Sequence, residues 1–344
     1  MAEGTRTHLW LVVLIAVIVL GGLYVTVWRG GEERLTVYCA HDSVYADAVL
    51  RRFEEETGIP IAVRYDTEAT KSLGLVEMLI REREDPRCDV FWNNELLGTL
   101  DLQDRGVLAT YRGPGWERIP DGFKDPEGHW TGFGARLRVY IVNTDRMEAT
   151  AEAVDERMAA QDLSGVAIAK PLYGTTLTHY SVLWHRWGPD RLKAWHADLR
   201  DRGVREVDSN GTSKRVVSEG ICAMGFTDTD DFFLAKDAEH PVDMVPVRLE
   251  DGATICIPNT VAMIQGTDKR EAAQKLVDYL LSAETELELA RSSSRQIPLG
   301  PVDPQKLPDE VRALAEMGAQ GVELNDLLEA RNACLAWLKS EYVE

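Results

Sequence analysis

The chain has 344 residues, with 57 acidic against 38 basic side chains and a formal net charge of -19, a length that allows two domains. A hydrophobic fraction of 44% and a charged fraction of 28% are ordinary for a folded protein and exclude disordered, collagenous and disulfide-scaffold chains. The acidic balance also excludes nucleic acid as the main partner, because phosphate backbones are bound by surfaces rich in lysine and arginine.

An uncharged apolar run occupies residues 9–28. It is long enough to cross the roughly 30 Å hydrocarbon layer as a helix, and Trp10, Tyr24 and Trp28 lie near its ends, where aromatic rings favour the interface. A cleaved signal peptide is the alternative, although no good small-x-small cleavage site follows the run. We predict that residues 1–30 form a membrane anchor or signal segment. The rest of the chain would then be periplasmic or extracytoplasmic, held at the inner membrane by this transmembrane helix.

Apolar strand-like segments alternate with amphipathic ones in the first half of the remaining chain. Strands are predicted at residues 35–39, 59–65 and 89–92, and helices at 45–56 and 70–83. This β-α-β-α-β order is typical of a parallel sheet with helices on both faces. Ligands of such sheets lie beyond the carboxyl ends of the strands. The polar loops at 40–43, 66–71 and 93–95 are therefore candidate ligand contacts.

A second α/β set follows. Strands are predicted at residues 139–142, 166–169, 204–207 and 221–226, an extended run at 254–264, and helices at 178–187, 269–289 and 324–342. Polar clusters again come directly after strands, at 208–213 and 227–231. The pattern predicts a second α/β lobe with ligand contacts of its own.

Several motifs occur in order along the chain: Val37-Tyr-Cys-Ala-His-Asp42, Tyr65-Asp-Thr-Glu-Ala-Thr-Lys71, Asp89-Val-Phe-Trp-Asn-Asn-Glu95, Thr227-Asp-Thr-Asp-Asp231 and Ile257-Pro-Asn-Thr-Val261. This succession resembles the periplasmic solute-binding proteins of ABC importers, in particular the ferric-ion-binding branch. The resemblance implies an α/β, two-lobe periplasmic-binding-protein fold (type II-like) that closes over its ligand. It places crossovers near 136–142 and 255–262, lobe 1 at 34–135 and 260–344, and lobe 2 at 136–259.

The resemblance also implies a metal site. Iron in this branch is often held by a histidine, a glutamate and two adjacent tyrosines, and His41 and Glu95 each lie about one position from the first two. The tyrosine pair is missing, because Thr229 and Asp230 stand in its place. The predicted metal ligands are His41, Glu95 and Asp230, with Fe³⁺ as the transported ligand. The alternative is that Asp230 and its neighbour Asp231 only start a helix, where carboxylates are favoured.

Other loops favour an anion. Residues 174–176 and 210–213 precede predicted helices, and Thr70 starts the helix predicted at 70–83 in the first lobe. Helix amino termini bind phosphate or carboxylate groups unless the residues are plain caps. The predicted ligand-binding residues are His41, Thr70, Glu95, Thr175, Thr176, Asn210, Thr212, Asp228 and Asp230. The ligand is then iron(III) or another metal, with or without an anion. The alternatives are a small organic zwitterion or anion such as an aminophosphonate, or a polyamine.

No hydrolase, phosphate-loop or zinc-protease motif occurs, so we predict a binding protein and not an enzyme. The five cysteines are widely spaced and form no C-x-x-C pair, so neither a zinc site nor a redox motif is expected. We predict a monomeric, membrane-tethered binding component that docks on an ABC permease. A membrane-tethered sensor is the remaining alternative.

Overall fold

The computed structural model describes residues 34–41, 43–66 and 73–342. The predicted anchor at 1–30 and the predicted contact Thr70 lie outside these ranges. Within them, no helix combines the length and the apolar character needed to cross a bilayer.

The first lobe is built on a parallel sheet, as its alternating pattern predicts. Its elements are β1 (Leu35–Cys39), α2 (Ser43–Thr57), β2 (Ile61–Tyr65), α3 (Leu73–Arg81), β3 (Val90–Asn93), α4 (Leu97–Asp104), β4 (Leu108–Ala109), α5 (Pro114–Arg118) and the short helix η2 (Asp121–Phe123). Strands β2, β1 and β3 pair in parallel in that order. Helix α2 ends before Gly58, whose φ of 70° is a left-handed conformation that glycine adopts without strain.

The second lobe repeats this architecture. It contains α6 (Ala151–Ala159), β6 (Val166–Ala169), α7 (Gly174–Trp187), α8 (Pro189–Asp201), β7 (Arg205–Val207), α9 (Asn210–Ser218), β8 (Met224–Asp228), α10 (Thr229–Asp237) and β9 (Val242–Pro246). Strand β6 pairs in parallel with both β7 and β8. After this lobe the chain forms α11 (Arg270–Leu280), α12 (Ala283–Arg291), η3 (Pro304–Lys306), α13 (Asp309–Gly318) and α14 (Leu328–Tyr342).

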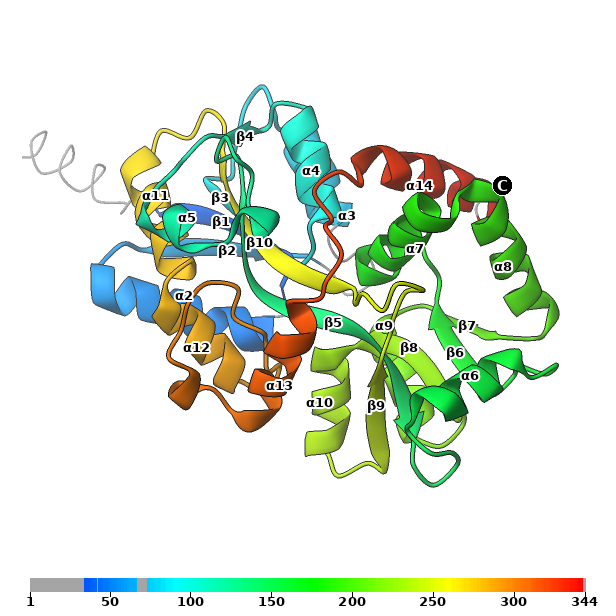
Figure 1. Ribbon diagram of the computed structural model, residues 1–344. Helices are drawn as coiled ribbons and strands as arrows, with labels where there is room; N and C mark the ends of the chain where they lie inside the picture. Colours follow the sequence, from blue (N-terminus) through cyan, green and yellow to red (C-terminus); the bar gives the residue numbers. More distant parts are fainter. Residues whose placement is uncertain (1–33, 42, 67–72, 343–344) are drawn as a thin grey trace, which may run out of the picture.

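Two long strands, β5 (Thr131–Asn143) and β10 (Cys256–Ile264), join the lobes (Figure 1). Strand β5 pairs with β10 over residues 131–137 and then with β8 and β9 over residues 138–143. Strand β10 pairs in turn with β3 and β4 of the first lobe. The predicted crossovers correspond to these strands, and the two-lobe α/β fold is confirmed.

Each lobe has its own apolar core. Trp92 and Phe133 pack with helix α2 residues such as Phe53 in the first lobe, and Tyr180 and Phe226 belong to the main cluster of the second. All five cysteines are buried, and none of them forms a disulfide. The buried cysteines act as small apolar core residues.

Helix α14 departs from the predicted lobe boundary, which assigned residues 260–344 to the first lobe. Its buried face, Cys334, Leu335 and Leu338, lies in the apolar cluster of the second lobe, and Figure 1 shows α14 beside α7. A buried ion pair of 3.3 Å between Arg331 and Asp101 links α14 back to α4. The helix therefore contacts both lobes. An amphipathic sequence predicts a buried helix face but not which lobe covers it.

Replacing Leu338 with alanine is expected to lower the free energy of unfolding by about 2–4 kcal/mol, because the fully buried side chain would leave a cavity against α7. Chemical denaturation of the full-length protein measures the effect. The exposed neighbour Lys339 provides the control, since its replacement by alanine should change stability by less than about 0.5 kcal/mol. Equal stability of both variants would contradict the packing of α14 on the second lobe.

Candidate ligand-binding site

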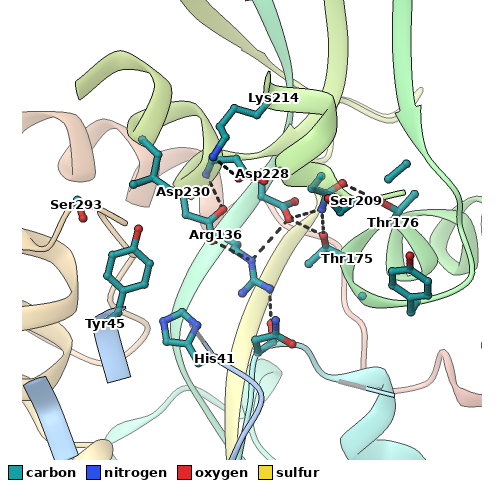
Figure 2. A pocket seen from close by; sticks show the side chains of 18 of the residues that line it. His41, Tyr45, Arg136, Thr175, Thr176, Ser209, Lys214, Asp228, Asp230 and Ser293 are labelled. Atoms are coloured by element: carbon teal, nitrogen blue, oxygen red, sulfur yellow. Dashed lines mark hydrogen bonds and ion pairs between the residues drawn. The ribbon is translucent and has the colours of Figure 1, made fainter. Parts of the chain in front are cut away.

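A cavity of about 410 Å³ lies between the lobes. Its walls include His41, Tyr45, Asn94 and Ser293 from the first-lobe side, and Lys170, Thr175, Thr176, Asn210, Lys214, Asp228 and Asp230 from the second (Figure 2). Most of these residues follow the carboxyl ends of strands β1, β3, β6, β7 and β8. This is the expected position for a ligand of open α/β sheets.

Asp228 is the centre of the polar network in this cavity. Its carboxylate accepts a hydrogen bond from Arg138 Nη1 at 2.8 Å, from the Thr175 hydroxyl at 2.5 Å and from Asn210 Nδ2 at 3.0 Å. The Thr176 hydroxyl donates to Asn210 Oδ1 at 3.0 Å. Asp228 therefore fixes the amino ends of α7 and α9 beside each other, and its charge is already balanced by the buried Arg138.

The amino ends of α7 and α9 supply backbone donors to the cavity wall. Gly174 opens α7 at a φ of 60° with no other atom within 4 Å of its missing Cβ, and the first amides of any α-helix lack intrahelical acceptors. At α9, the Ser209 hydroxyl accepts a hydrogen bond from the backbone N–H of Thr212 at 3.1 Å. Thr212 thus belongs to a helix cap and is not part of the wall, whereas Gly174, Thr175, Asn210 and their neighbours are.

Glu95, a predicted metal ligand, is used differently. Its carboxylate accepts the backbone N–H groups of Leu97 at 2.6 Å and Gly98 at 2.7 Å and so caps helix α4. Thr178 of the second lobe approaches it at 3.5 Å, and burial raises the pKa of Glu95. The side chain does not line the main cavity. A glutamate just before a helix suits a cap and a ligand equally well in sequence, because carboxylates are favoured at helix amino ends.

His41 lines the cavity, and its ring is fixed by contacts with neighbouring side chains. It stacks on Trp92 and Tyr45, with ring centroids 5.3 and 5.6 Å apart. Gln296 Nε2 lies 3.0 Å from His41 Nε2. The other end of the same amide, Gln296 Oε1, accepts a hydrogen bond from Asn259 Nδ2 at 2.7 Å. The Gln296 amide nitrogen therefore points toward His41 Nε2 and fixes the position of the ring.

The structure does not bring the three predicted metal ligands together. Among the residues described, no three histidine, cysteine, aspartate or glutamate side chains are grouped so that they could hold a metal ion. Asp230 does lie on the wall, and it also lies in the first turn of α10, so both interpretations of this residue describe its position. The Glu95 carboxylate is instead engaged by the first backbone N–H groups of α4 and does not reach the cavity wall where Asp230 lies.

The sequence interpretation missed the basic residues of the site. Arg136 Nε lies 3.8 Å from Asp228 and 3.7 Å from Asp230, and Lys214 Nζ lies 3.4 Å from Asp231. Lys170 also lines the cavity. The available signal was the pair of arginines two positions apart in β5, because charged residues are rarely buried in a strand without a partner.

His179, a buried residue of α7, is expected to make stability depend on pH. Burial, together with the positive charge of Arg138, lowers the pKa of His179 to about 3, whereas an unfolded histidine titrates near 6.5. Below about pH 6.5 the unfolded chain binds a proton that the folded protein excludes, so stability should fall by up to about 1.4 kcal/mol per pH unit until about pH 3.

The variant His179→Phe is expected to lose this part of the pH dependence, because phenylalanine cannot be protonated. Denaturant unfolding at pH 7 and at pH 4.5 measures the slope for wild type and variant. The exposed His185 on the same helix is the control, and His185→Gln should retain the wild-type slope. An unchanged slope in His179→Phe would show that His179 does not cause it.

Residues 48–317 match the family described as "Bacterial extracellular solute-binding protein". The chain belongs to this family. The family's description names solute binding, and its extracellular location fits the location predicted from the sequence. The prediction of a solute-binding protein is confirmed.

Individual relatives confirm the resemblance to the ferric-ion-binding branch. "Iron uptake protein A2" of Synechocystis is 25% identical over 234 residues, which cover 62% of this chain and 64% of that protein, slightly under two thirds of its length. Iron-bound HitA from Pseudomonas aeruginosa has a TM-score of 0.75 at 20% identity, covering 90% of this chain and 99% of HitA. AfuA from Actinobacillus pleuropneumoniae, with fructose-6-phosphate bound, has a TM-score of 0.75 at 19% identity, covering 90% of this chain and 98% of AfuA. These structures share the two-lobe fold.

Proposed function

We propose that this protein is the binding component of an ABC importer whose cargo is iron(III) in a complex with an oxygen-rich anion. One observation carries the proposal: the cavity between the lobes presents donors for an anion, while the described residues contain no group of three metal ligands. The anion would supply most of the oxygen ligands that a trivalent ion needs. Closure of the lobes would exclude water and strengthen the charge interactions.

The electrostatics of the cavity support an anionic cargo. Arg136, Lys170 and Lys214 line it together with the amino ends of α7 and α9, in a chain whose net charge is -19. Helix amino termini and basic side chains together form anion-binding sites. The carboxylates of the wall are balanced from within the protein, because Asp228 pairs with Arg138 and Asp231 with Lys214.

Iron as the metal rests on the relatives and on the chemistry of the wall. HitA was solved with iron bound, and the Synechocystis relative is an iron uptake protein. Hard oxygen donors are present in this cavity, namely the Asp230 carboxylate and the phenols of Tyr45 and Tyr173. Carboxylate and phenolate oxygens suit a hard ion, so these side chains would complete a coordination shell begun by the anion.

A second candidate is an organic phosphate or phosphonate without metal. The same helix amino termini and basic side chains would bind a phosphate group, and AfuA carries fructose-6-phosphate. An aminophosphonate belongs to this class. A polyamine fits the cavity less well, because its amines would have to displace Arg136, Arg138 and Lys214 from the carboxylates.

We place the protein outside the cytoplasm, with residues 1–30 as its membrane anchor, as a monomer that delivers its ligand to the permease. The anchored form would keep the binding protein close to the permease without free diffusion. Fractionation of cells that express the full-length chain tests the anchor, since an anchored protein remains with the membranes after a high-salt wash.

Calorimetric titration of the full-length protein tests the cargo. The probes are ferric citrate, citrate, fructose 6-phosphate, 2-aminoethylphosphonate and spermidine. We expect ferric citrate to bind most tightly and spermidine not to bind. Lys214→Gln should weaken binding, whereas Lys193→Gln, at an exposed lysine on α8, should not. Tight binding of a phosphorylated probe with no binding of ferric citrate would select the second candidate.

A further inference from the structure

Arg136 lies where β5 passes from one lobe to the other. Its side chain is 4% exposed, and it makes contacts in two directions. Nη2 donates a hydrogen bond to the carbonyl oxygen of Asn94 in the first lobe. Nε faces Asp228 and Asp230 of the second lobe at 3.8 and 3.7 Å. One guanidinium therefore links backbone of the first lobe to carboxylates of the second.

The third corner of this guanidinium has no partner. Arg136 Nη1 is buried and makes no hydrogen bond, and Arg136 lines the cavity. Figure 2 shows the group between His41 and the two aspartates. A buried donor without an acceptor is unfavourable, and more so when it is charged. The unoccupied donor therefore favours an acceptor supplied from the cavity.

We propose that Arg136 binds an anionic oxygen of the cargo through Nη1 and couples this contact to closure of the lobes. The inference rests on the anionic cargo proposed above. The three edges of the guanidinium would then hold the ligand, the first lobe and the second lobe at once. Because this set of contacts forms only when the lobes are close together, the ligand stabilises the closed state in preference to an open one.

Arg138 shows that this role is specific to Arg136. Arg138 lies two residues further along β5 and also has nitrogens without hydrogen-bond partners, Nε and Nη2. It is fully buried and does not line the cavity. Its direct partners are Asp228 and Thr175 of the second lobe. Arg138 is therefore a positioning residue for the amino end of α7, whereas Arg136 reaches the ligand space.

A lysine at position 136 should not be able to perform the function of the arginine. An ammonium group carries the same charge, but it is a compact donor that cannot direct separate N–H groups to Asn94, the aspartates and a ligand in one plane. Arg136→Lys is therefore expected to bind an anion at least roughly tenfold more weakly than wild type, and Arg136→Gln at least roughly thirtyfold more weakly.

The experiment combines calorimetry with a distance measurement on the full-length protein. Citrate, inorganic phosphate and ferric citrate are titrated into wild type, Arg136→Gln, Arg136→Lys and the control Arg64→Gln, at an exposed arginine on β2. Spin labels on cysteines introduced at the exposed positions Glu56 and Asp201 report the separation of the lobes. We expect ligand to narrow the distance distribution in wild type and in the control but not in the Arg136 variants.

Each outcome separates this inference from the proposed function. Equal binding and equal closure in wild type and both Arg136 variants would overturn the role of Arg136 and leave the iron proposal standing. Binding of citrate or phosphate that depends on Arg136, without binding of ferric citrate, would support the role of Arg136 and overturn the iron proposal. If wild type binds none of the three probes, both fall. Arg136→Lys keeps the test decisive if Arg136→Gln does not fold.

Discussion

Asp228→Ala is expected to lower the free energy of unfolding by roughly 3–5 kcal/mol and to abolish ligand binding. The side chain of Arg138 has an exposed fraction of 0%, and its Nη1 donates to Asp228 at 2.8 Å. Removal of the carboxylate would leave this guanidinium charged and buried without a counter-charge. It would also remove the acceptor that holds Thr175 and Asn210 together. Urea denaturation and calorimetry with the same protein measure both effects.

An exposed ion pair provides the control for this prediction. Asp208 pairs with Lys170 at 3.4 Å, but its side chain is 87% exposed. Asp208→Ala should therefore change stability by less than about 1 kcal/mol. The double variant Asp228→Leu with Arg138→Met should recover much of the lost stability, because it removes both buried charges. A loss below about 1 kcal/mol in Asp228→Ala would contradict a buried, charge-balanced pair.

Glu286→Ala is expected to destabilise the protein by a similar amount, roughly 3–5 kcal/mol. Glu286 is fully buried in α12. Its carboxylate accepts the backbone N–H groups of Gly134 at 3.0 Å, Leu299 at 2.7 Å and Gly300 at 3.1 Å, and it pairs with Arg118 at 2.7 Å. Alanine would leave these donors buried without an acceptor. Because Gly134 belongs to β5, the loss should also loosen the crossover strand.

Glu284 is the matched control, since it lies in the first turn of the same helix but is exposed. Glu284→Ala should remain within about 0.5 kcal/mol of wild type. Hydrogen exchange at the amides of Gly134 and Leu299 adds a local measurement, with faster exchange expected only in Glu286→Ala. Wild-type exchange at both amides in that variant would show that Glu286 does not support the crossover.

Local patterns in the sequence were sufficient to predict much of the fold and part of the cavity wall. Apolar strands followed by polar loops gave the order of β1 to β3, and the convergence of parallel strand ends explains why Thr175, Asn210, Asp228 and Asp230 meet. These residues are separated by up to 55 positions, yet the topology alone brings them together.

Contacts that depend on a distant partner were not predictable in the same way. Arg138 and Asp228 are 90 residues apart, and no local pattern shows that a strand arginine faces an aspartate at the end of another strand. Glu95 has the same sequence context as a ligand and as a cap of α4. The buried face of α14 is evident from its spacing, but the choice of α7 as its partner depends on the assembled lobes.

The pairing of β5 with β10 also has a consequence for the order of events during capture. The hydrogen bonds between β10 and residues 131–137 of β5 resist sliding of one strand along the other. Relative motion of the lobes should therefore be a rotation about this pair of strands. Asp228, Thr175 and Asn210 are joined by hydrogen bonds within the second lobe, so we expect them to move with it as one unit. A ligand can therefore bind first to this lobe, which is a preformed half of the site, at a rate set by diffusion. Rotation of the first lobe would follow and would determine how long the ligand stays bound.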